Sequence, residues 1–269
     1  MALTSGREPT VRELFGLSGR VVLITGGTGH LGSAMSRALA EAGASVVLTS
    51  RDEARARMAA ESLPRAGAAR HFGIALDHMD PPSIGRGFDE ALGLAGRIDA
   101  LVNNANEALP DDWTTVTAEA FSRHLTNATG YFLLARLTRD HAVGRGAPAS
   151  IVQVGSMYGL VASYPDAYEG VCPASPVAYH TLKGGILQMT RHLAAYWAGD
   201  RVRVNGLSPG PFPGEKAPAA MVERLREKLP MKRMGLPFEL KGAVVFLASD
   251  ASSFMTGQNL VIDGGWTAW

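Results

Sequence analysis

Residues 21–32 read VVLITGGTGHLG, an apolar and β-branched run that ends in a cluster of glycines. The first five residues, VVLIT, are typical of a short strand buried on both faces of a sheet. Apolar residues then recur at helical spacing at Leu31, Met35 and Leu39. The stretch therefore predicts a strand, a tight glycine turn and an amphipathic helix.

Six further runs of the same kind follow along the chain. They occupy residues 45–50, 71–76, 98–104, 150–156, 202–208 and 259–263. Because stretches with helical periodicity lie between them, we expect right-handed crossovers and a parallel sheet. The fold class that we predict is α/β, with a single Rossmann-type doubly wound parallel sheet of seven strands and helices on both faces.

Two segments interrupt this alternation. Residues 160–177 contain three prolines and residues 208–218 contain four, and neither segment has a helical period. We expect substrate loops over residues 157–176 and 208–230, at the carboxyl edge of the sheet where ligands bind in doubly wound folds. Residues 1–18 are polar and mixed, which predicts an N-terminal arm before one domain over residues 19–269.

Composition excludes several classes of partner. The 269 residues include 26 basic and 25 acidic side chains, so no basic field is available for nucleic acid or a membrane surface. The one cysteine, Cys172, cannot form an internal disulfide, and no Cys/His cluster has the spacing of a metal site. With no apolar run long enough to cross a bilayer and no leader-like start, we expect a cytoplasmic protein without a metal, a membrane or a nucleic-acid partner.

The glycine turn is suited to a pyrophosphate, because glycines allow a sharp, closely approaching backbone and the helix begins with unpaired N–H groups. The alternative is an ordinary strand-to-helix turn, but the place of this turn in the first strand–helix unit favours nucleotide binding.

In this glycine turn the sequence resembles the short-chain dehydrogenase/reductase family. The family's compact branch has TGxxxGxG, in which His30 replaces the second glycine. Gly26, Gly29 and Gly32 match TGxxGxxG of the extended branch, the nucleotide-sugar epimerases and dehydratases.

Later segments are similar to the compact branch, and the resemblance covers nearly the whole chain from Arg20 to Trp266. Residues 201–210, RVRVNGLSPG, resemble the segment that borders the nicotinamide, and residues 246–266 resemble the C-terminal signature. A threonine that often follows Pro-Gly in the family is absent from PFPGEK. The resemblance implies cofactor contacts at Gly26, Thr28, His30, Leu31, Ser50, Arg51, Asp77, Asn103, Ala105, Tyr179, Lys183, Pro209 and Gly210.

The end of the second strand predicts which cofactor is used. A carboxylate there would bond both ribose hydroxyls and repel a 2′-phosphate, whereas this chain has Ser50 followed by Arg51. A guanidinium forms charge-assisted, bidentate bonds to phosphate. We therefore expect NADP(H) to be preferred, with NAD(H) as the alternative if Arg51 is only a solvated loop charge.

Tyr179 and Lys183 are four residues apart in a helical stretch, so they share one face. A nearby ammonium stabilises a phenolate and lowers the tyrosine pKa, so Tyr179 can exchange a proton with a substrate oxygen while hydride moves to or from nicotinamide. The resemblance implies that Ser156 positions the carbonyl and that Asn127 holds a water relaying protons to the lysine. Because asparagine is unfavourable inside a helix, another requirement must keep Asn127 there.

Ser156 and Tyr179 are further apart than the family resemblance implies, which indicates an inserted loop at the mouth of the site. Tyr158, Tyr168 and Glu169, with Ser156, are candidate substrate contacts, and the alternative is a lid that only excludes water. His30 lies among the phosphate-binding backbone groups and is a candidate pyrophosphate contact. The other histidines lack metal-ligand spacing, and we expect surface or core roles for them.

The sequence predicts an NAD(P)(H)-dependent oxidoreductase that interconverts a secondary alcohol and a ketone on a small-molecule substrate. Its loop spacing and GGWTAW ending resemble surface-sugar (sialic-acid-like) pathway oxidoreductases and sugar-acid 5-dehydrogenases, which implies a polyhydroxylated sugar-like or sugar-acid substrate. Two alternatives remain: a nucleotide-sugar dehydratase or epimerase, and a non-catalytic NADP-binding regulator. The resemblance also implies a homodimer or homotetramer formed through the helices that carry Asn127 and Tyr179.

Overall fold

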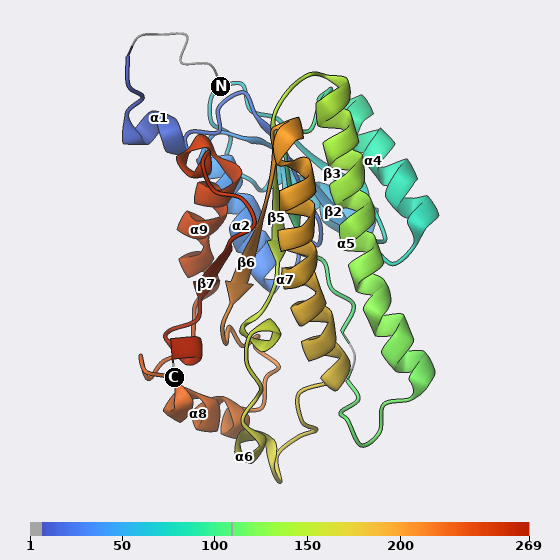
Figure 1. Ribbon diagram of the computed structural model, residues 1–269, viewed down its shortest axis with the longest axis vertical. Coiled ribbons are helices and arrows are strands. Elements are labelled where there is room, and N and C mark those ends of the chain that lie inside the picture. Colours follow the sequence, from blue (N-terminus) through green and yellow to red (C-terminus); the bar gives the residue numbers. More distant parts are fainter. Residues whose placement is uncertain (1–6, 109, 269) are drawn as a thin grey trace.

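The computed structural model describes residues 7–108 and 110–268 and contains one seven-stranded sheet in the order β3-β2-β1-β4-β5-β6-β7. Every pair of neighbouring strands is parallel. The strands are β1 (Val21–Ile24), β2 (Ser45–Ser50), β3 (His71–Ala75), β4 (Ala100–Asn103), β5 (Ala149–Val154), β6 (Val202–Pro209) and β7 (Asn259–Ile262). The predicted seven-stranded, doubly wound Rossmann-type fold is confirmed (Figure 1).

Helices cover both faces of the sheet (Figure 1). One face packs against α2 (His30–Glu41), α3 (Glu53–Glu61) and α9 (Lys241–Ala248), and the other against α4 (Pro81–Ala95), α5 (Ala118–Gly144) and α7 (Val177–Trp197). Alternate residues of each strand enter opposite cores: in β1, Val22 and Ile24 join the first and Val21 and Leu23 the second. This two-sided burial explains the continuous apolar strand sequences.

The strand order reverses between β1 and β4, and this reversal positions the site. The chain builds β1, β2 and β3 outward in one direction, and then returns to place β4 on the other side of β1. Ligands bind outside the carboxyl ends of the strands at such a point, because the connecting segments diverge there. The glycine turn after β1 and the segments after β4 and β5 meet at this edge.

The strand ends and the two proline-rich segments differ from expectation. Asp77, Asn104 and Ser156 lie just beyond their strands, because β3, β4 and β5 end at Ala75, Asn103 and Val154. The segments 157–176 and 208–230 are not wholly loops, since they contain α6 (Pro165–Tyr168) and α8 (Ala219–Lys228). Proline is tolerated in the first turn of a helix, where its missing N–H has no intrahelical partner. Pro165 is the first residue of α6, and Pro218 immediately precedes α8.

The end of the N-terminal arm is attached to the fold. A short helix, α1 (Val11–Phe15), is capped by Thr10. Leu17 is 1% exposed and joins the first core, and its N–H donates to the carbonyl of Ala42 at 2.8 Å. Of the helices in the described residues, none combines the length and the apolar character needed to cross a membrane.

Gly73 allows α3 to lie directly on β3, because a Cβ at this position would stand 2.1–2.3 Å from the backbone of Ala56 and Arg57. We expect Gly73→Ala to lower the free energy of unfolding by about 1–3 kcal/mol, as overpacking typically does. The matched control is Gly85→Ala in α4, whose Cβ would meet nothing within 4 Å and should stabilise the helix by up to about 1 kcal/mol. Urea unfolding of both variants tests this, and a Gly73→Ala protein as stable as the wild type would contradict the close packing.

Candidate active site

The glycine turn forms a rigid cradle between β1 and α2. Gly26 has a φ of +60°, and a Cβ on Gly32 would stand 2.1 Å from the Gly26 carbonyl oxygen, so both positions require glycine. Gly29, the residue before α2, offers no side chain to cap the helix. The amide of Asn104 donates to the carbonyls of Thr25 at 3.0 Å and of Gly26 at 3.2 Å. A glycine-rich turn in front of uncapped helical N–H groups fits a pyrophosphate.

Two neighbouring asparagines at the end of β4 have different contacts. The hydroxyl oxygen of Thr25 accepts from the backbone N–H groups of Asn104 at 2.9 Å and Ala105 at 3.0 Å, which joins the ends of β1 and β4. Asn103 is fully buried, and its amide donates to the Tyr131 carbonyl and to Gln153, both at 2.9 Å. This amide therefore ties the sheet to α5, and the cofactor contact predicted for Asn103 stays a prediction.

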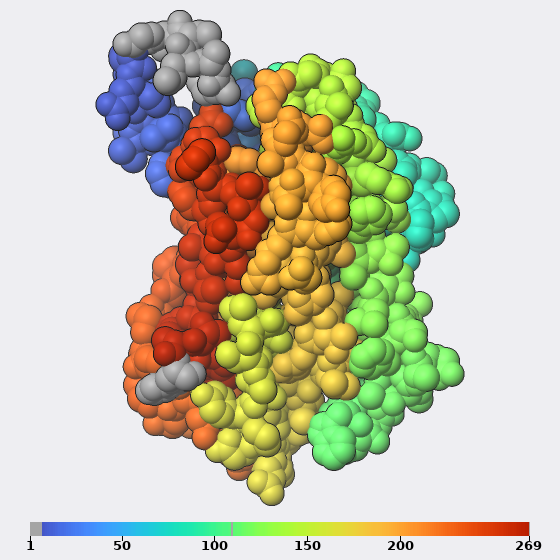
Figure 2. All heavy atoms as spheres, viewed as in Figure 1, coloured from blue at the N-terminus to red at the C-terminus, as the bar shows by residue number. Residues whose placement is uncertain are grey.

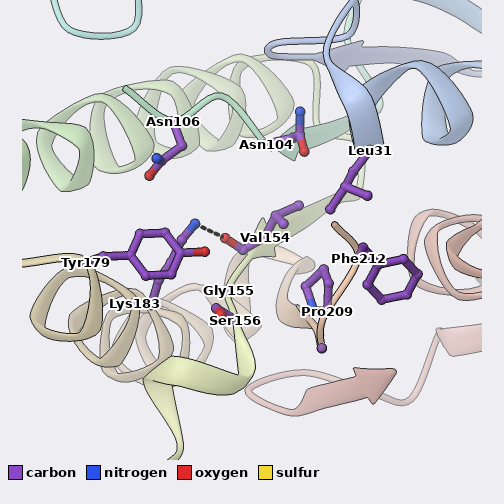
Figure 3. A pocket seen from close by; sticks show the side chains of 11 residues that line it. Leu31, Asn104, Asn106, Val154, Gly155, Ser156, Tyr179, Lys183, Pro209 and Phe212 are labelled. Atoms are coloured by element: carbon purple, nitrogen blue, oxygen red, sulfur yellow. Dashed lines mark hydrogen bonds between the residues drawn. The ribbon is translucent and has the colours of Figure 1, made fainter. Parts of the chain in front are cut away.

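A cavity of about 230 Å³ opens at the reversal of strand order, between β5, α7 and the glycine turn (Figure 3). Its lining residues are Leu31, Asn104, Asn106, Val154, Gly155, Ser156, Tyr179, Lys183, Pro209, Gly210 and Phe212. Six of these residues were predicted from the sequence as catalytic or cofactor-binding: Leu31, Ser156, Tyr179, Lys183, Pro209 and Gly210. Phe212 was missed, although its place just after Pro209 and Gly210 was the available signal.

Tyr179 and Lys183 lie one turn apart on α7 and face the cavity. Lys183 is 3% exposed, and its Nζ donates to the Val154 carbonyl at 2.9 Å, as the dashed line in Figure 3 marks. The same Nζ lies 5.5 Å from the ring centroid of Tyr131 and 5.6 Å from that of Tyr179. Burial lowers the pKa of Lys183 from 10.5 to about 7, because the ammonium has lost its water.

Tyr179 does not have the lowered pKa that its spacing from Lys183 predicted. Burial raises the pKa of Tyr179, and the hydrogen bond from the Ser156 hydroxyl opposes that rise. The lysine ammonium is directed to the Val154 carbonyl rather than to the phenol. Ser156, at the start of the short turn after β5, is therefore the neighbour that favours the phenolate here.

Asn127 lies in α5 with its side chain fully buried. Its Oδ1 accepts from the Glu107 N–H at 2.8 Å, and its Nδ2 donates to the carbonyls of Glu107 at 3.3 Å and of His124 at 2.7 Å. These bonds explain why a helix-disfavouring asparagine is kept at this position. The side chain joins the segment after β4 to α5 and does not line the cavity.

The predicted adenosine contacts lie past the ends of β2 and β3. Ser50 accepts from the Asp52 N–H at 3.2 Å, and Asp77 accepts from the Met79 N–H at 2.9 Å. The Arg51 side chain is 70% exposed, with its guanidinium 3.6 Å from the Glu107 carboxylate. A charge held this loosely remains available to a phosphate.

A second arginine lies beside the glycine turn. Arg55, in the first turn of α3, donates to the Thr28 carbonyl at 3.2 Å. Within residues 7–108 and 110–268, no group of three or more His, Cys, Asp or Glu side chains is arranged to hold a metal ion.

The inserted segment docks on α8 rather than opening into the cavity, and Figure 2 shows its yellow surface beside the orange of α8. The hydroxyls of Tyr158 and Tyr168 bond each other at 2.9 Å, and the Tyr158 ring stacks on His180 with 4.5 Å between centroids. Glu169 is exposed, and its carbonyl accepts from Arg224 at 2.6 Å. None of the three lines the cavity. The tyrosine hydroxyls are paired with each other, and the substrate contacts predicted for the three residues stay predictions.

Comparison with known proteins gives consistent matches along the whole chain. A family model described as enoyl-(acyl carrier protein) reductase matches residues 28–267. Galactitol 2-dehydrogenase (L-tagatose-forming) of Cereibacter sphaeroides is 36% identical over 264 residues, which cover 96% of this chain and 99% of that protein. Sorbose reductase of Schizosaccharomyces pombe is 31% identical, covering 94% and 98% respectively. A crystal structure of gluconate 5-dehydrogenase from Burkholderia cenocepacia, in complex with NADP and tartrate, has a TM-score of 0.83 and 31% identity, covering 97% and 100%.

We expect Lys183→Met to stabilise the protein at neutral pH. Since burial lowers the pKa of Lys183 to about 7, the native state disfavours the ammonium, and this cost is complete below pH 7 and disappears as pH rises towards 10.5. The free energy of unfolding should rise by a few kcal/mol at pH 6, at about 1.4 kcal/mol per pKa unit, and the gain should vanish near pH 10.5. The Val154 carbonyl keeps a partner in the Tyr131 hydroxyl at 3.3 Å.

Urea unfolding at pH 6, 8 and 10 measures this difference. The control is Lys216→Met at an exposed lysine, which should change stability little at any of these pH values. A Lys183→Met variant less stable than the wild type at pH 6 would show that the buried ammonium contributes net stabilisation.

Proposed function

The chain belongs to the short-chain dehydrogenase/reductase family of oxidoreductases that act on CH–OH groups, and from this we propose that it interconverts a secondary alcohol and a ketone on a polyol, ketose or sugar acid, with NADP(H) preferred. The observation that carries the proposal is the cavity in which Ser156, Tyr179 and Lys183 converge beside the glycine turn. The galactitol, sorbose and gluconate enzymes are named for polyhydroxylated substrates, which supports the substrate class.

Ser156, Tyr179 and Lys183 divide the proton chemistry between them. In ketone reduction the Ser156 hydroxyl donates to the substrate oxygen and Tyr179 delivers a proton to it; in alcohol oxidation Tyr179 accepts that proton. A Lys183 pKa of about 7 allows this residue to release or take up a proton near neutral pH. The nicotinamide cofactor, when bound, supplies or accepts the hydride.

The cofactor-holding residues in this proposal form a path along the carboxyl edge of the sheet. Arg51, together with Ser50, would bind a 2′-phosphate, and the Gly26–Gly32 turn with Thr28, His30 and Leu31 would hold the pyrophosphate. The remaining contacts would come from Asp77, Asn103, Ala105, Tyr179, Lys183, Pro209 and Gly210. Support for NADP(H) comes from the exposed guanidinium of Arg51 and from the NADP in the gluconate 5-dehydrogenase structure.

A homodimer or homotetramer with α5 and α7 at the interface, acting in the cytoplasm, completes the proposal. These helices pack together through Tyr131, Leu182 and Ile186 and lie side by side on the face that Figure 2 presents. A second copy of the chain could pack its own α5 and α7 helices against this pair of helices.

Tyr179→Phe should lower kcat for keto-sugar reduction by 100-fold or more, roughly what general acid catalysis contributes. NADPH binding, followed by fluorescence titration, should stay within about twofold of the wild type, because the ring remains. The matched control is Tyr196→Phe on the same helix, where the side chain is 73% exposed and turnover should not change. Substantial turnover by the Tyr179→Phe variant would show that Tyr179 is not the proton donor and acceptor of the reaction.

Arg51→Ala should weaken NADPH binding by about tenfold or more, because a charge-assisted hydrogen bond contributes about 1.5–3 kcal/mol. NADH binding should not change, because NADH lacks the 2′-phosphate. Arg57→Ala in α3, at an exposed arginine paired with Glu53, is the control and should leave both affinities as they are. Equal affinities of the wild type for NADPH and NADH, unaltered in Arg51→Ala, would refute NADP(H) preference while leaving the oxidoreductase proposal intact.

A further inference from the structure

We propose that His78 is a positioning residue for the reaction: its imidazole fixes Asn127 and thereby the α5 segment behind Lys183. This inference rests on the proposed function and on the proton-relay role that the family resemblance implies for Asn127. His78 lies in the turn between β3 and α4, and its Nε2 is 2.7 Å from Asn127 Oδ1. The imidazole is 8% exposed, so no bulk water replaces this partner.

The bonds around Asn127 assign the direction of the His78 hydrogen bond. The Asn127 amide nitrogen uses both hydrogens on the carbonyls of Glu107 and His124. Its Oδ1 already accepts from the Glu107 N–H at 2.8 Å, so it can only accept a second time. His78 must therefore carry its hydrogen on Nε2 and donate it. With this bond every hydrogen-bonding site of the buried amide has a partner, and the amide has one orientation.

The segment that carries His78 is itself held rigidly. Asp77 Oδ1 accepts from the Met79 N–H at 2.9 Å, and the Asp77 N–H donates to Ser83 Oγ at 3.0 Å. A Cβ on Gly130 would stand 2.1 Å from the His78 carbonyl oxygen, so α5 lies directly on the backbone of this turn. His78 consequently meets α5 twice on one face, through its backbone at Gly130 and through its imidazole at Asn127 three residues earlier.

Loss of the imidazole would leave a buried Oδ1 with one donor and would free the amide to rotate. The Glu107 and His124 carbonyls, which the same amide holds, would then move as well. His124 lies against the catalytic centre, with its ring centroid 6.2 Å from that of Tyr179. A loosened Asn127 therefore disturbs proton transfer, whereas the cavity residues that bind substrate are untouched.

Two substitutions separate positioning from packing. His78→Leu fills the space but removes the donor, and His78→Gln keeps an N–H near the position of Nε2. We expect His78→Leu to lower kcat by about tenfold, in proportion to the loss of one buried hydrogen bond. Substrate KM and NADPH affinity should stay within about twofold, and His78→Gln should restore most of kcat. Unchanged kcat in His78→Leu, or an equal loss in folded His78→Gln, would overturn the proposal.

A double-mutant cycle tests whether His78 acts through Asn127. If it does, Asn127→Ala should lower kcat, and adding His78→Leu should lower it no further. A second, independent tenfold loss in the double variant would overturn the inference. An Asn127→Ala enzyme with wild-type kcat would also overturn it, while leaving the Tyr179 chemistry in place.

The hydrogen bond can be tested without turnover. Long-range ¹H–¹⁵N NMR spectra of the whole protein should show neutral His78 as the Nε2–H tautomer, with slow exchange of this hydrogen that is lost in Asn127→Ala. The Nδ1–H tautomer would overturn the assignment. This readout remains available if no sugar or polyol is turned over, so failure of the proposed function is distinguished from failure of the inference.

Discussion

The reversal of strand order between β1 and β4 is the constraint on which the site depends. Parallel strands deliver all their carboxyl ends to one edge of the sheet, and at the reversal the following segments turn away from each other. The side chains of Thr25 and Asn104 join the two strand ends: the Thr25 hydroxyl accepts two backbone hydrogen bonds and the Asn104 amide donates two to backbone carbonyls, so the edges of the opening are held firmly. The cavity at this place is therefore a consequence of the topology, and the side chains that line it determine only its chemistry.

The chemistry is obtained at a cost in stability. Lys183 places an ammonium in a buried position where its hydrogen-bond partner is a carbonyl, and burial lowers its pKa to about 7. Tyr179 is subject to the same desolvation, which raises its pKa. The two shifts have opposite directions because the charged form is the protonated lysine and the deprotonated tyrosine. They separate the proton affinities of the two groups, whose ordinary pKa values are 10.5 and 10.0, so that near neutral pH the phenol keeps its proton while the lysine can lose one.

Periodicity and spacing could predict the fold and the reacting residues, because both are local properties of the chain. Alternating apolar runs and helical stretches predicted seven parallel strands, and the i,i+4 spacing of Tyr179 and Lys183 placed them on one helix face. Asn103 and Asn104 could not be told apart, because consecutive residues of a strand face opposite sides and a one-residue difference in strand end decides which amide is buried. The docking of the inserted segment could not be predicted, because the contacts of Glu169 with Arg224 and of Tyr168 with Tyr158 form only in the folded chain.

The α5 helix physically connects the two ends of the cofactor path. Its residues Asn127, Gly130 and Tyr131 follow at helical intervals and contact the Glu107 segment, the His78 backbone and the Val154 carbonyl, respectively. In the first two contacts the backbone of another segment lies directly against α5. In the third, Tyr131 donates to the Val154 carbonyl, which also accepts a hydrogen bond from Lys183. A displacement of the β3–α4 turn therefore reaches the lysine through one rigid helix. A lone histidine has no sequence pattern that reveals such a link, because its meaning arises only from the partner that the fold brings to it.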